Sequence, residues 1–306
     1  MAWRPRKPHW NKTMPTYAFV TLDVFTDRPF GGNPLAVFTD ARGMTDAQMQ
    51  SLAAEMNLSE TTFVLPPQDP GHTARVRIFH RTAEMPFAGH PSIGTGYVLA
   101  SQGATGLLTL EVIAGVVEVT IARDAAGAPN GAVIAAPQAL SMGREFPVEA
   151  VAACAGIDVR DVVVSNHTPV GASVGVDFIF AEVTGEALSR ATPDVGAFRR
   201  AEAERPDLKG RLSLHLYARD GETIRARMFA PLSGTFEDPA TGSANATLAA
   251  LLVSLSGVDQ AAFTISQGVE MGRPSVLRAG ARRTPDGVRA TVGGGCAPMF
   301  RGEVVL

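Results

Sequence analysis

Apolar positions recur along the chain with two periods, and each period predicts a different kind of element. Polar and apolar residues alternate over Thr73–Phe79 and again over Glu118–Ile121, which is typical of half-buried strands. Apolar residues at 49, 52, 53 and 56 instead follow helical spacing, behind a capping-box sequence that begins at Thr45. This spacing predicts a short amphipathic helix that ends near Asn57.

Further β-rich runs lie on both sides of this helix and through the second half of the chain. Tyr17–Phe25 and Pro34–Phe38 are joined by a turn rich in Gly and Pro, so an opening hairpin is expected. Later runs with strand character occupy 174–183, 212–218, 223–229, 263–266 and 288–292. Ala, Gly and Pro cluster at 123–138, and we expect the crossover between two halves there.

Two segments of the chain resemble each other, and each predicts the start of a buried helix. Gly89-His90-Pro91-Ser92 and Asp238-Pro239-Ala240-Thr241-Gly242-Ser243 both lead into apolar runs, and a matching Arg-x-Phe precedes each copy. Proline is expected at the first helical position, with aspartate as N-cap. The duplication predicts two halves, each a sheet wrapped around a central helix, with both helix N-termini at one anion-binding cleft.

Composition narrows the classes of protein to consider. Of 306 residues, 45% are hydrophobic and 19% charged, which suffices for two moderate cores. The net charge of -3 gives no general attraction to nucleic acid or to an anionic membrane. No apolar run reaches the length of about 18 residues that a membrane span needs, and the basic N-terminus lacks the apolar core of a signal peptide. A cytoplasmic location is expected.

The domain boundaries follow from the duplication and the N-terminal composition. We expect a disordered basic extension at 1–14, an N-terminal half at 15–128 and a C-terminal half at 129–306. A return of the last strand to the N-terminal half is left open.

Four motifs together carry a resemblance to a known family. They are Asn57-Leu58-Ser59-Glu60-Thr61-Thr62-Phe63, Gly89-His90-Pro91, Asp238-Pro239-Ala240-Thr241-Gly242-Ser243-Ala244 and Gln267-Gly268-Val269-Glu270-Met271-Gly272-Arg273-Pro274-Ser275, and the early Gly31-Gly32-Asn33-Pro34 fits the same pattern. In this order they resemble the PhzF-like family of phenazine biosynthesis, from Tyr17 to the C-terminus. The resemblance implies an α+β fold of the diaminopimelate-epimerase type, with an active site between two pseudo-symmetric halves and usually a homodimer.

The same resemblance implies a proton-transfer chemistry. The family's isomerase acts on trans-2,3-dihydro-3-hydroxyanthranilate through a glutamate, without metal or organic cofactor, and Glu60 matches that glutamate. Burial beside Phe63 would raise the pKa of the carboxyl toward neutrality, so that one group can take a proton and return it. On local sequence alone, the alternative for Glu60 is a solvated residue just past a helix end, since most glutamates lie at the surface.

Other site residues are carried over position by position. His90 matches the family's histidine, and a neutral imidazole at a helix N-terminus would orient the substrate. Asp238 is expected to bond an amine or hydroxyl of the substrate, and Ser243, with the backbone of Gly242 and Gly89, to bind its carboxylate. Plain N-capping is the alternative for His90 and for Asp238. Arg273 is expected to fix a loop.

Several other chemistries lack support in the sequence. Lys209 is the one lysine after the N-terminal extension and lies in a polar stretch, which argues against a pyridoxal-phosphate Schiff base. Cys154 and Cys296 lie outside both duplicated motifs, so the two-thiol racemisation of related epimerases is not expected. Dinucleotide and phosphate-loop motifs are absent, and the histidines lack metal-ligand spacing.

The prediction is therefore a cofactor-independent isomerase of a small carboxylate. Two alternatives stay open. One is an epimerase or dehydratase of another small amino or hydroxy acid, and the other is a non-catalytic binding protein on the same fold. The motifs specify proton-handling groups and leave the substrate and its stereochemistry undetermined.

Overall fold

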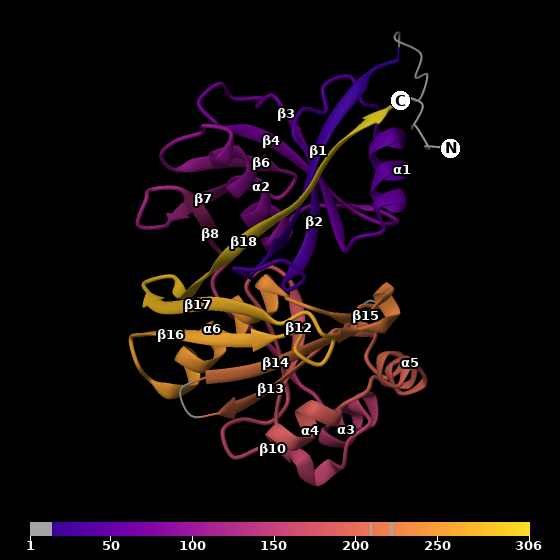
Figure 1. Cartoon of the computed structure of the whole chain (residues 1–306). Coiled ribbons are helices and arrows are strands. Elements are labelled where there is room, and N and C mark those ends of the chain that lie inside the picture. The colour runs from indigo at the N-terminus through magenta and orange to yellow at the C-terminus, as the bar shows by residue number, and fades with distance from the viewer. Residues whose placement is uncertain (1–13, 209, 221–222) are drawn as a thin grey trace, which may run out of the picture.

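Two curved halves, each wrapped around one buried helix, make up the molecule (Figure 1). The structure is a computed structural model, and it describes residues 14–208, 210–220 and 223–306. The predicted extension at 1–14, apart from Met14, and Lys209 therefore lie outside the described residues. None of the described helices combines the length and apolar composition that a membrane crossing requires.

The N-terminal half contains helices α1 (Asp46–Met56) and α2 (Gly89–Ser101). Its strands are β1 (Thr16–Val24), β2 (Asn33–Phe38), β3 (Glu60–Leu65), β4 (Ala74–His80), β5 (Glu84–Met85), β6 (Leu108–Val112), β7 (Gly115–Arg123) and β8 (Pro129–Ala135).

The C-terminal half contains helices α3 (Val148–Ala155), α4 (Gly185–Arg190), α5 (Val195–Ala203) and α6 (Gly242–Ser256), with short 3-10 turns at Val159–Asp161, Pro206–Leu208 and Pro231–Ser233. Its strands are β9 (Ser141–Glu145), β10 (Val162–Val163), β11 (Val170–Ser173), β12 (Asp177–Val183), β13 (Leu214–Asp220), β14 (Thr223–Ala230), β15 (Thr235–Asp238), β16 (Gln260–Gln267), β17 (Ser275–Thr284) and β18 (Gly287–Val305).

The same order of strand pairing occurs in both halves. β3 runs parallel to β2 and antiparallel to β4, and β4 runs parallel to β6, which continues into antiparallel β7 and β8. In the second half β13 runs parallel to β12 and antiparallel to β14, and β14 runs parallel to β16, which continues into antiparallel β17 and β18. The predicted α+β fold with two pseudo-symmetric halves is confirmed.

The two central helices are buried because their sequences are apolar or small on nearly every face. Eleven of the α6 residues are buried, including Leu248, Leu251 and Leu252, so that helix has no polar stripe to turn toward water. In α2, small residues allow a close approach to the sheet. A Cβ on Gly94 would lie 2.5 Å from Leu35, and one on Gly96 would lie 2.7 Å from Val119. One apolar core therefore runs continuously through both halves.

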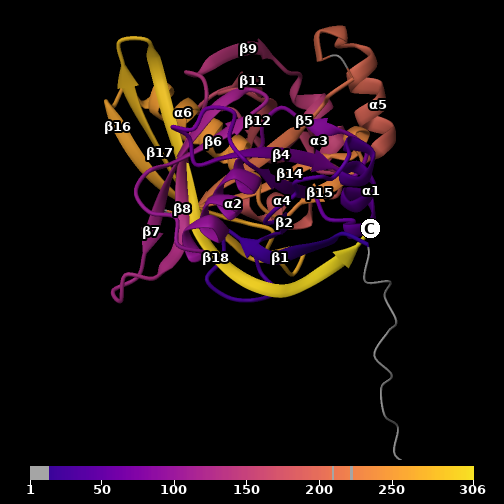
Figure 2. The same cartoon turned by 90° about the horizontal axis from the view of Figure 1, so that it is seen from above.

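Strand β18 connects the two halves. It pairs with β17 and β8, and its last part pairs antiparallel with β1 from Val24 back to Thr16. Figure 1 shows this strand, in yellow, crossing from the C-terminal half to the chain end beside β1, and Figure 2 shows the same pairing from above. The long shared strand fixes the position of one half relative to the other.

The stretch 123–138 was predicted as a crossover, and this prediction is correct only at its end, because 136–140 connects β8 to β9 and so leads from one half to the other. The preceding part is not a loop. It contains β8, in which Ala132 and Ile134 point into the core. Close packing requires a glycine at position 131 of this strand, since a Cβ on Gly131 would lie 2.2 Å from the carbonyl oxygen of Gly294 on β18. A run of Ala and Gly that resembles a loop is here a strand in close contact with its neighbour.

The starts of the duplicated helices also differ from the prediction, whereas α1 agrees with it. α1 has the capping box at Thr45 and ends at Asn57, which adopts a left-handed conformation with φ 52°. By contrast, α2 begins at Gly89 and α6 at Gly242, after N-caps that make no side-chain capping bond. Asp238 is not an N-cap and neither proline is the first helical residue, because Asp238 ends β15 and bonds other partners.

Helices α3, α4 and α5 were not predicted. They pack against β12 and β13 and form a second apolar core there. Helix α1 packs beside β2 and β3, where a third apolar core lies.

Candidate active site

The N-termini of α2 and α6 meet at the junction between the halves. A Cβ built on Gly89 would lie 3.6 Å from the amide nitrogen of Ser243 and 3.7 Å from the Cα of Gly242. A narrow hollow opens beside these residues, with Phe87 and Val292 in its wall. The first amides of a helix have no intrahelical partner and carry partial positive charge, so the two helix starts together suit an anion.

A second and larger hollow lies elsewhere, on the outer face of β16, β17 and β18. Many of its lining residues are alanines, and Arg282, Asp286 and Arg289 also line it. None of the predicted site residues contributes to it.

Glu60 and His90 face each other inside the junction. Glu60 is the first residue of β3, where it pairs in register with Leu35 and with His80. Its side chain is 14% exposed, that of His90 is 6% exposed, and His90 Nδ1 lies 3.4 Å from Glu60 Oε2. Glu60 Oε2 and His90 Nε2 are buried without a hydrogen-bond partner among the described residues.

Burial sets the protonation of this pair. It raises the pKa of Glu60 to about 8, an effect that the nearby charge of Asp238 increases and that of Arg81 opposes. Burial also lowers the pKa of His90 to about 3. Near neutral pH Glu60 therefore carries its proton and His90 is neutral, so their contact joins two uncharged groups instead of an ion pair.

Asp238 approaches the same junction from the C-terminal half. It is 8% exposed, and its carboxylate accepts hydrogen bonds from Asn33 Nδ2 at 3.0 Å and from Thr241 Oγ1 at 2.6 Å. Burial raises the pKa of Asp238 to about 6, and these two hydrogen bonds act in the opposite direction. Asp238 is thus ionised at neutral pH while Glu60 is protonated, and the two carboxyl groups differ in charge state.

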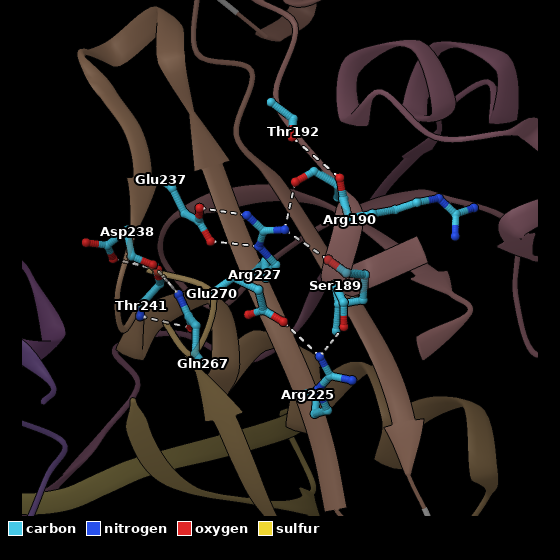
Figure 3. A network of polar contacts seen from close by, with 12 residues as sticks. Ser189, Arg190, Thr192, Arg225, Arg227, Glu237, Asp238, Thr241, Gln267 and Glu270 are labelled. Atoms are coloured by element: carbon cyan, nitrogen blue, oxygen red, sulfur yellow. Dashed lines mark hydrogen bonds and ion pairs between the residues drawn. The ribbon is translucent and has the colours of Figure 1, made fainter. Parts of the chain in front are cut away.

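Gln267 shapes the backbone between Asp238 and α6 (Figure 3). Its amide nitrogen donates to the carbonyl oxygen of Asp238 at 2.8 Å and to Thr241 Oγ1 at 3.0 Å, while its oxygen accepts from the amide of Thr241 at 3.2 Å. On the far side of this loop, Ser275 Oγ donates to the carbonyl oxygen of Pro239 at 2.8 Å. The loop that carries Asp238 is therefore fixed by side chains from β16 and β17.

Arg81 was not predicted as a site residue. It follows directly on His80, the register partner of Glu60, and its Nη2 donates to the carbonyl oxygen of Gly234 at 2.8 Å. This bond joins the two halves. The positive charge of Arg81 also lowers the pKa of Glu60, which shows that it lies within electrostatic reach of that carboxyl.

Arg273 fixes a loop, as expected. It donates to the carbonyl oxygens of Gly31 and Gly32 at 2.7 and 2.9 Å and to Asp23 Oδ1 at 2.6 Å. The bonded segment leads into Asn33, which in turn reaches Asp238. Arg273 therefore supports the site from outside it.

The duplication extends to an ion pair in each half, partly buried in the N-terminal half and more deeply buried in the C-terminal half. Arg77 binds Glu84 and Arg227 binds Glu237, and each guanidinium lies about 5 Å from the phenylalanine ring two residues further on. Figure 3 shows the pair in the C-terminal half, where Arg227 also reaches the carbonyl groups of α4 and the residue after it. These pairs hold the short strands β5 and β15 that lead into the helix starts.

The structure brings together all six residues predicted from the sequence: Glu60, His90, Asp238, Ser243, Gly89 and Gly242. It adds Asn33, Arg81, Thr241 and Gln267. Asn33, Thr241 and Gln267 stand within the motifs that carried the family resemblance, and nothing in the local sequence indicates their bonds. Within the described ranges, no three His, Cys, Asp or Glu side chains form a group that could hold a metal ion.

Comparisons with known proteins agree with this architecture. The family model for phenazine biosynthesis-like protein matches residues 22–302. A trans-2,3-dihydro-3-hydroxyanthranilate isomerase of Pseudomonas fluorescens is 37% identical over 303 residues, covering 94% of this chain and 99% of the relative.

Solved structures extend the comparison to the fold. A phenazine biosynthesis protein of the PhzF family from Bacillus anthracis superposes with a TM-score of 0.85 at 25% identity, covering 96% of this chain and all of that one. A hydroxyproline epimerase from Agrobacterium vitis shares the fold with a TM-score of 0.63 at 14% identity, covering 95% of this chain and 93% of the epimerase. The resemblance read from the motifs is confirmed.

Proposed function

Because the chain belongs to the phenazine biosynthesis-like PhzF family and is an isomerase, we propose that it isomerises a small carboxylate by proton transfer through Glu60. The observation that supports this most directly is the protonated, buried carboxyl of Glu60 beside neutral His90. A group with a pKa near the working pH can give a proton and take one back within a single turnover.

The surrounding residues have separate roles in this proposal. His90 is uncharged and lies 3.4 Å from Glu60. It orients the substrate and does not take the proton from the carboxyl of Glu60. The amides at Gly89, Gly242 and Ser243 bind the substrate carboxylate at the two helix starts. Asp238, held ionised, accepts a hydrogen bond from an amine or hydroxyl of the substrate.

The charge difference between the two carboxyl groups is central to the mechanism. A negative Asp238 disfavours a second negative charge nearby, so it helps to keep Glu60 protonated. Once Glu60 has given its proton to one carbon, the same repulsion raises its tendency to recover a proton from another. No second proton-transfer group is needed for a shift of this kind.

The substrate is proposed by similarity. The relative from Pseudomonas fluorescens is named for trans-2,3-dihydro-3-hydroxyanthranilate, and at 37% identity this compound is the first substrate to test. Epimerisation or dehydration of another small amino or hydroxy acid uses the same groups and is the second candidate. A hydroxyproline epimerase shares the fold, but the fold alone does not choose between the two candidates.

The proposal is tested by deuterium incorporation in D2O, measured by mass spectrometry. Protein dialysed against a chelator is offered trans-2,3-dihydro-3-hydroxyanthranilate and a panel of small amino and hydroxy acids. Incorporation in the wild type and its absence in Glu60→Gln would support proton transfer through Glu60 without metal. Equal incorporation in both proteins would refute the role of Glu60.

Three further expectations stay predictions: a homodimer, a cytoplasmic location and independence of any organic cofactor. Light scattering coupled to size-exclusion chromatography measures the first. Absorbance and mass spectra of the purified protein test the last.

A further inference from the structure

One buried residue of the N-terminal half has a backbone conformation that its side chain disfavours. Phe25 follows the last residue of β1 and has φ 68°, in the left-handed region that suits glycine and that a bulky residue rarely adopts. It is 0% exposed, and the proposed reaction assigns it no role. A strained conformation persists only where the surrounding structure holds it, so the contacts of Phe25 call for an explanation.

Strands of the C-terminal half hold the backbone of Phe25 from both sides. Its amide donates to the carbonyl oxygen of Gly295 on β18 at 2.8 Å, and its carbonyl oxygen accepts from the amide of Val276 on β17 at 2.8 Å. A Cβ on Gly294 would lie 2.7 Å from Phe25 Cδ1, so the ring packs closely against the backbone of β18. These contacts together fix the conformation of Phe25 and the direction of its ring.

The ring of Phe25 reaches the first residue of α6. A Cβ on Gly242 would lie 3.1 Å from Phe25 Cζ and 3.5 Å from Cε2, and the first of these distances is tighter than most Cβ contacts. A Cβ on Gly89 would in turn lie 3.7 Å from the Cα of Gly242. The start of α6 therefore contacts two parts of the N-terminal half, namely the ring of Phe25 and the start of α2.

The residues at this contact carry the anion-binding groups of the proposed function. The amides at Gly89, Gly242 and Ser243 can bind one carboxylate only if the two helix starts are held close together, because the partial charge of a helix terminus acts over a short range. The ring of Phe25 occupies the space beside Gly242 into which the first turn of α6 could otherwise move.

The equivalent position in the C-terminal half carries a smaller residue. The pairing of β1 with β2 corresponds to that of β11 with β12, so Phe25, which follows β1, corresponds to Val174, which follows β11. Val174 lines the narrow hollow beside Gly89 and Ser243. A large ring therefore packs against the start of α6, whereas a hollow remains beside Val174, where a ligand can approach the amides.

We propose that Phe25 is a positioning residue for the carboxylate site: its ring holds the first turn of α6 where the amides of both helix starts meet one anion. The proposal rests on the proposed function in assigning those amides to the carboxylate of the substrate. The strained backbone of Phe25 is the local consequence of directing its ring toward Gly242.

The test replaces phenylalanine by leucine at two buried positions. Phe25→Leu removes the ring atoms that face Gly242. Phe38→Leu on β2 is the matched control, because Phe38 is also 0% exposed in the N-terminal half but packs in the core beside α1. Affinity for 2-aminobenzoate, a stable aromatic carboxylate, is measured by calorimetry. Affinity for formate is measured from the NMR shifts of labelled backbone amides, and the melting temperature of each protein is recorded.

Both substitutions should lower the melting temperature, since each leaves a cavity in a core. Only Phe25→Leu should weaken the binding of both carboxylates, by at least about tenfold, because the amides of Gly242 and Ser243 are no longer held against Gly89. Formate has no group besides its carboxylate, so its weaker binding locates the effect at the amides. Unchanged affinity in Phe25→Leu, at a lowered melting temperature, would show that Phe25 only fills the core and would overturn the proposal.

Should Phe25→Leu fail to fold, Phe25→Met retains a longer, flexible side chain and is judged by the same two outcomes. Deuterium exchange separates this proposal from the proposed function. Weakened carboxylate binding in Phe25→Leu, with no exchange through Glu60 in the wild type, would uphold the positioning role and reject the proposed reaction. Exchange through Glu60 in the wild type, with unaltered carboxylate affinity in Phe25→Leu, would reject the positioning role and leave the reaction in place.

Discussion

Replacing Glu60 by glutamine is expected to stabilise the protein at alkaline pH, because the native chain holds a carboxyl where ionisation is disfavoured. Burial raises the pKa of Glu60 from 4.5 to about 8. In the unfolded chain the carboxyl titrates at its ordinary value, so between these two pKa values the folded state binds more protons. The stability of the wild type therefore falls as the pH rises from 4.5 to about 8 and is level above that.

The size of the effect follows from the same two pKa values. At about 1.4 kcal/mol per unit, their difference sets an upper limit of about 5 kcal/mol. The side chain of Glu60 is 14% exposed, and water and side-chain relaxation reduce the cost of its ionisation. We expect Glu60→Gln to exceed the wild type by about 2–4 kcal/mol near pH 9 and to match it near pH 5.

Chemical denaturation at a series of pH values, at constant ionic strength, measures this difference. Subtracting the two stability curves removes the contributions of His90 and Asp238, which both proteins share. Glu118→Gln on the exposed face of β7 is the matched control and should give a flat difference curve. A flat curve for Glu60→Gln as well would mean that Glu60 is ionised in the folded protein, and the proposed mechanism would lose its proton donor.

Three further predictions concern the junction and the arginine that supports it from outside. Gly89→Ala places a methyl 3.6 Å from the amide nitrogen of Ser243, an ordinary contact, so the melting temperature should hold while affinity for the carboxylate, measured by calorimetry, falls at least about tenfold. Arg81→Gln removes a charge that lowers the pKa of Glu60, so the basic limb of the pH–rate profile should move to higher pH, with Arg81→Lys unchanged as control. Arg273→Met leaves buried Asp23 without its cation and should cost about 2–4 kcal/mol of unfolding free energy at pH 7, a loss that a concurrent Asp23→Asn should largely remove.

Local sequence signals predicted what local interactions decide. Helix α1 begins after the capping box at Thr45 and ends at the left-handed Asn57, as the pattern indicated. The hydrogen bonds at both ends join residues only a few positions apart, so the local sequence determines them. The helix-start prediction failed at Asp238, whose side chain bonds Asn33, 205 positions away, in preference to capping α6. A contact across the two halves overrode the preference of aspartate for N-caps.

The candidate site shows the same limit. The motifs name Glu60, His90 and Asp238, yet the protonation of Glu60 depends on burial and on charges brought in by other strands. Arg81 stands in no motif and is identified only once β4 is paired with β3. Residue types are therefore predictable from the sequence, whereas charge states require the fold.

The duplication bears on the mechanism, because the scaffold is repeated and the proton-handling groups are not. The paired arginines Arg77 and Arg227 and the helix starts at Gly89 and Gly242 correspond between the halves. Leu214 pairs with Phe229 as Thr61 pairs with Phe79, however, so the residue before Leu214, Ser213, stands where the N-terminal half has Glu60.

Position by position, the helix starts differ as well. His90 and Ser243 each follow the first glycine of their helix, so a histidine in one half corresponds to a serine in the other. Transfer between two matched groups on opposite sides of a substrate requires a proton carrier in each half. Here the one protonated carboxyl belongs to the N-terminal half, and the C-terminal half contributes an ionised aspartate that maintains that protonation. This asymmetry favours a shift in which Glu60 both delivers and recovers the proton, on one face of the substrate, over inversion at a carbon by two opposed bases.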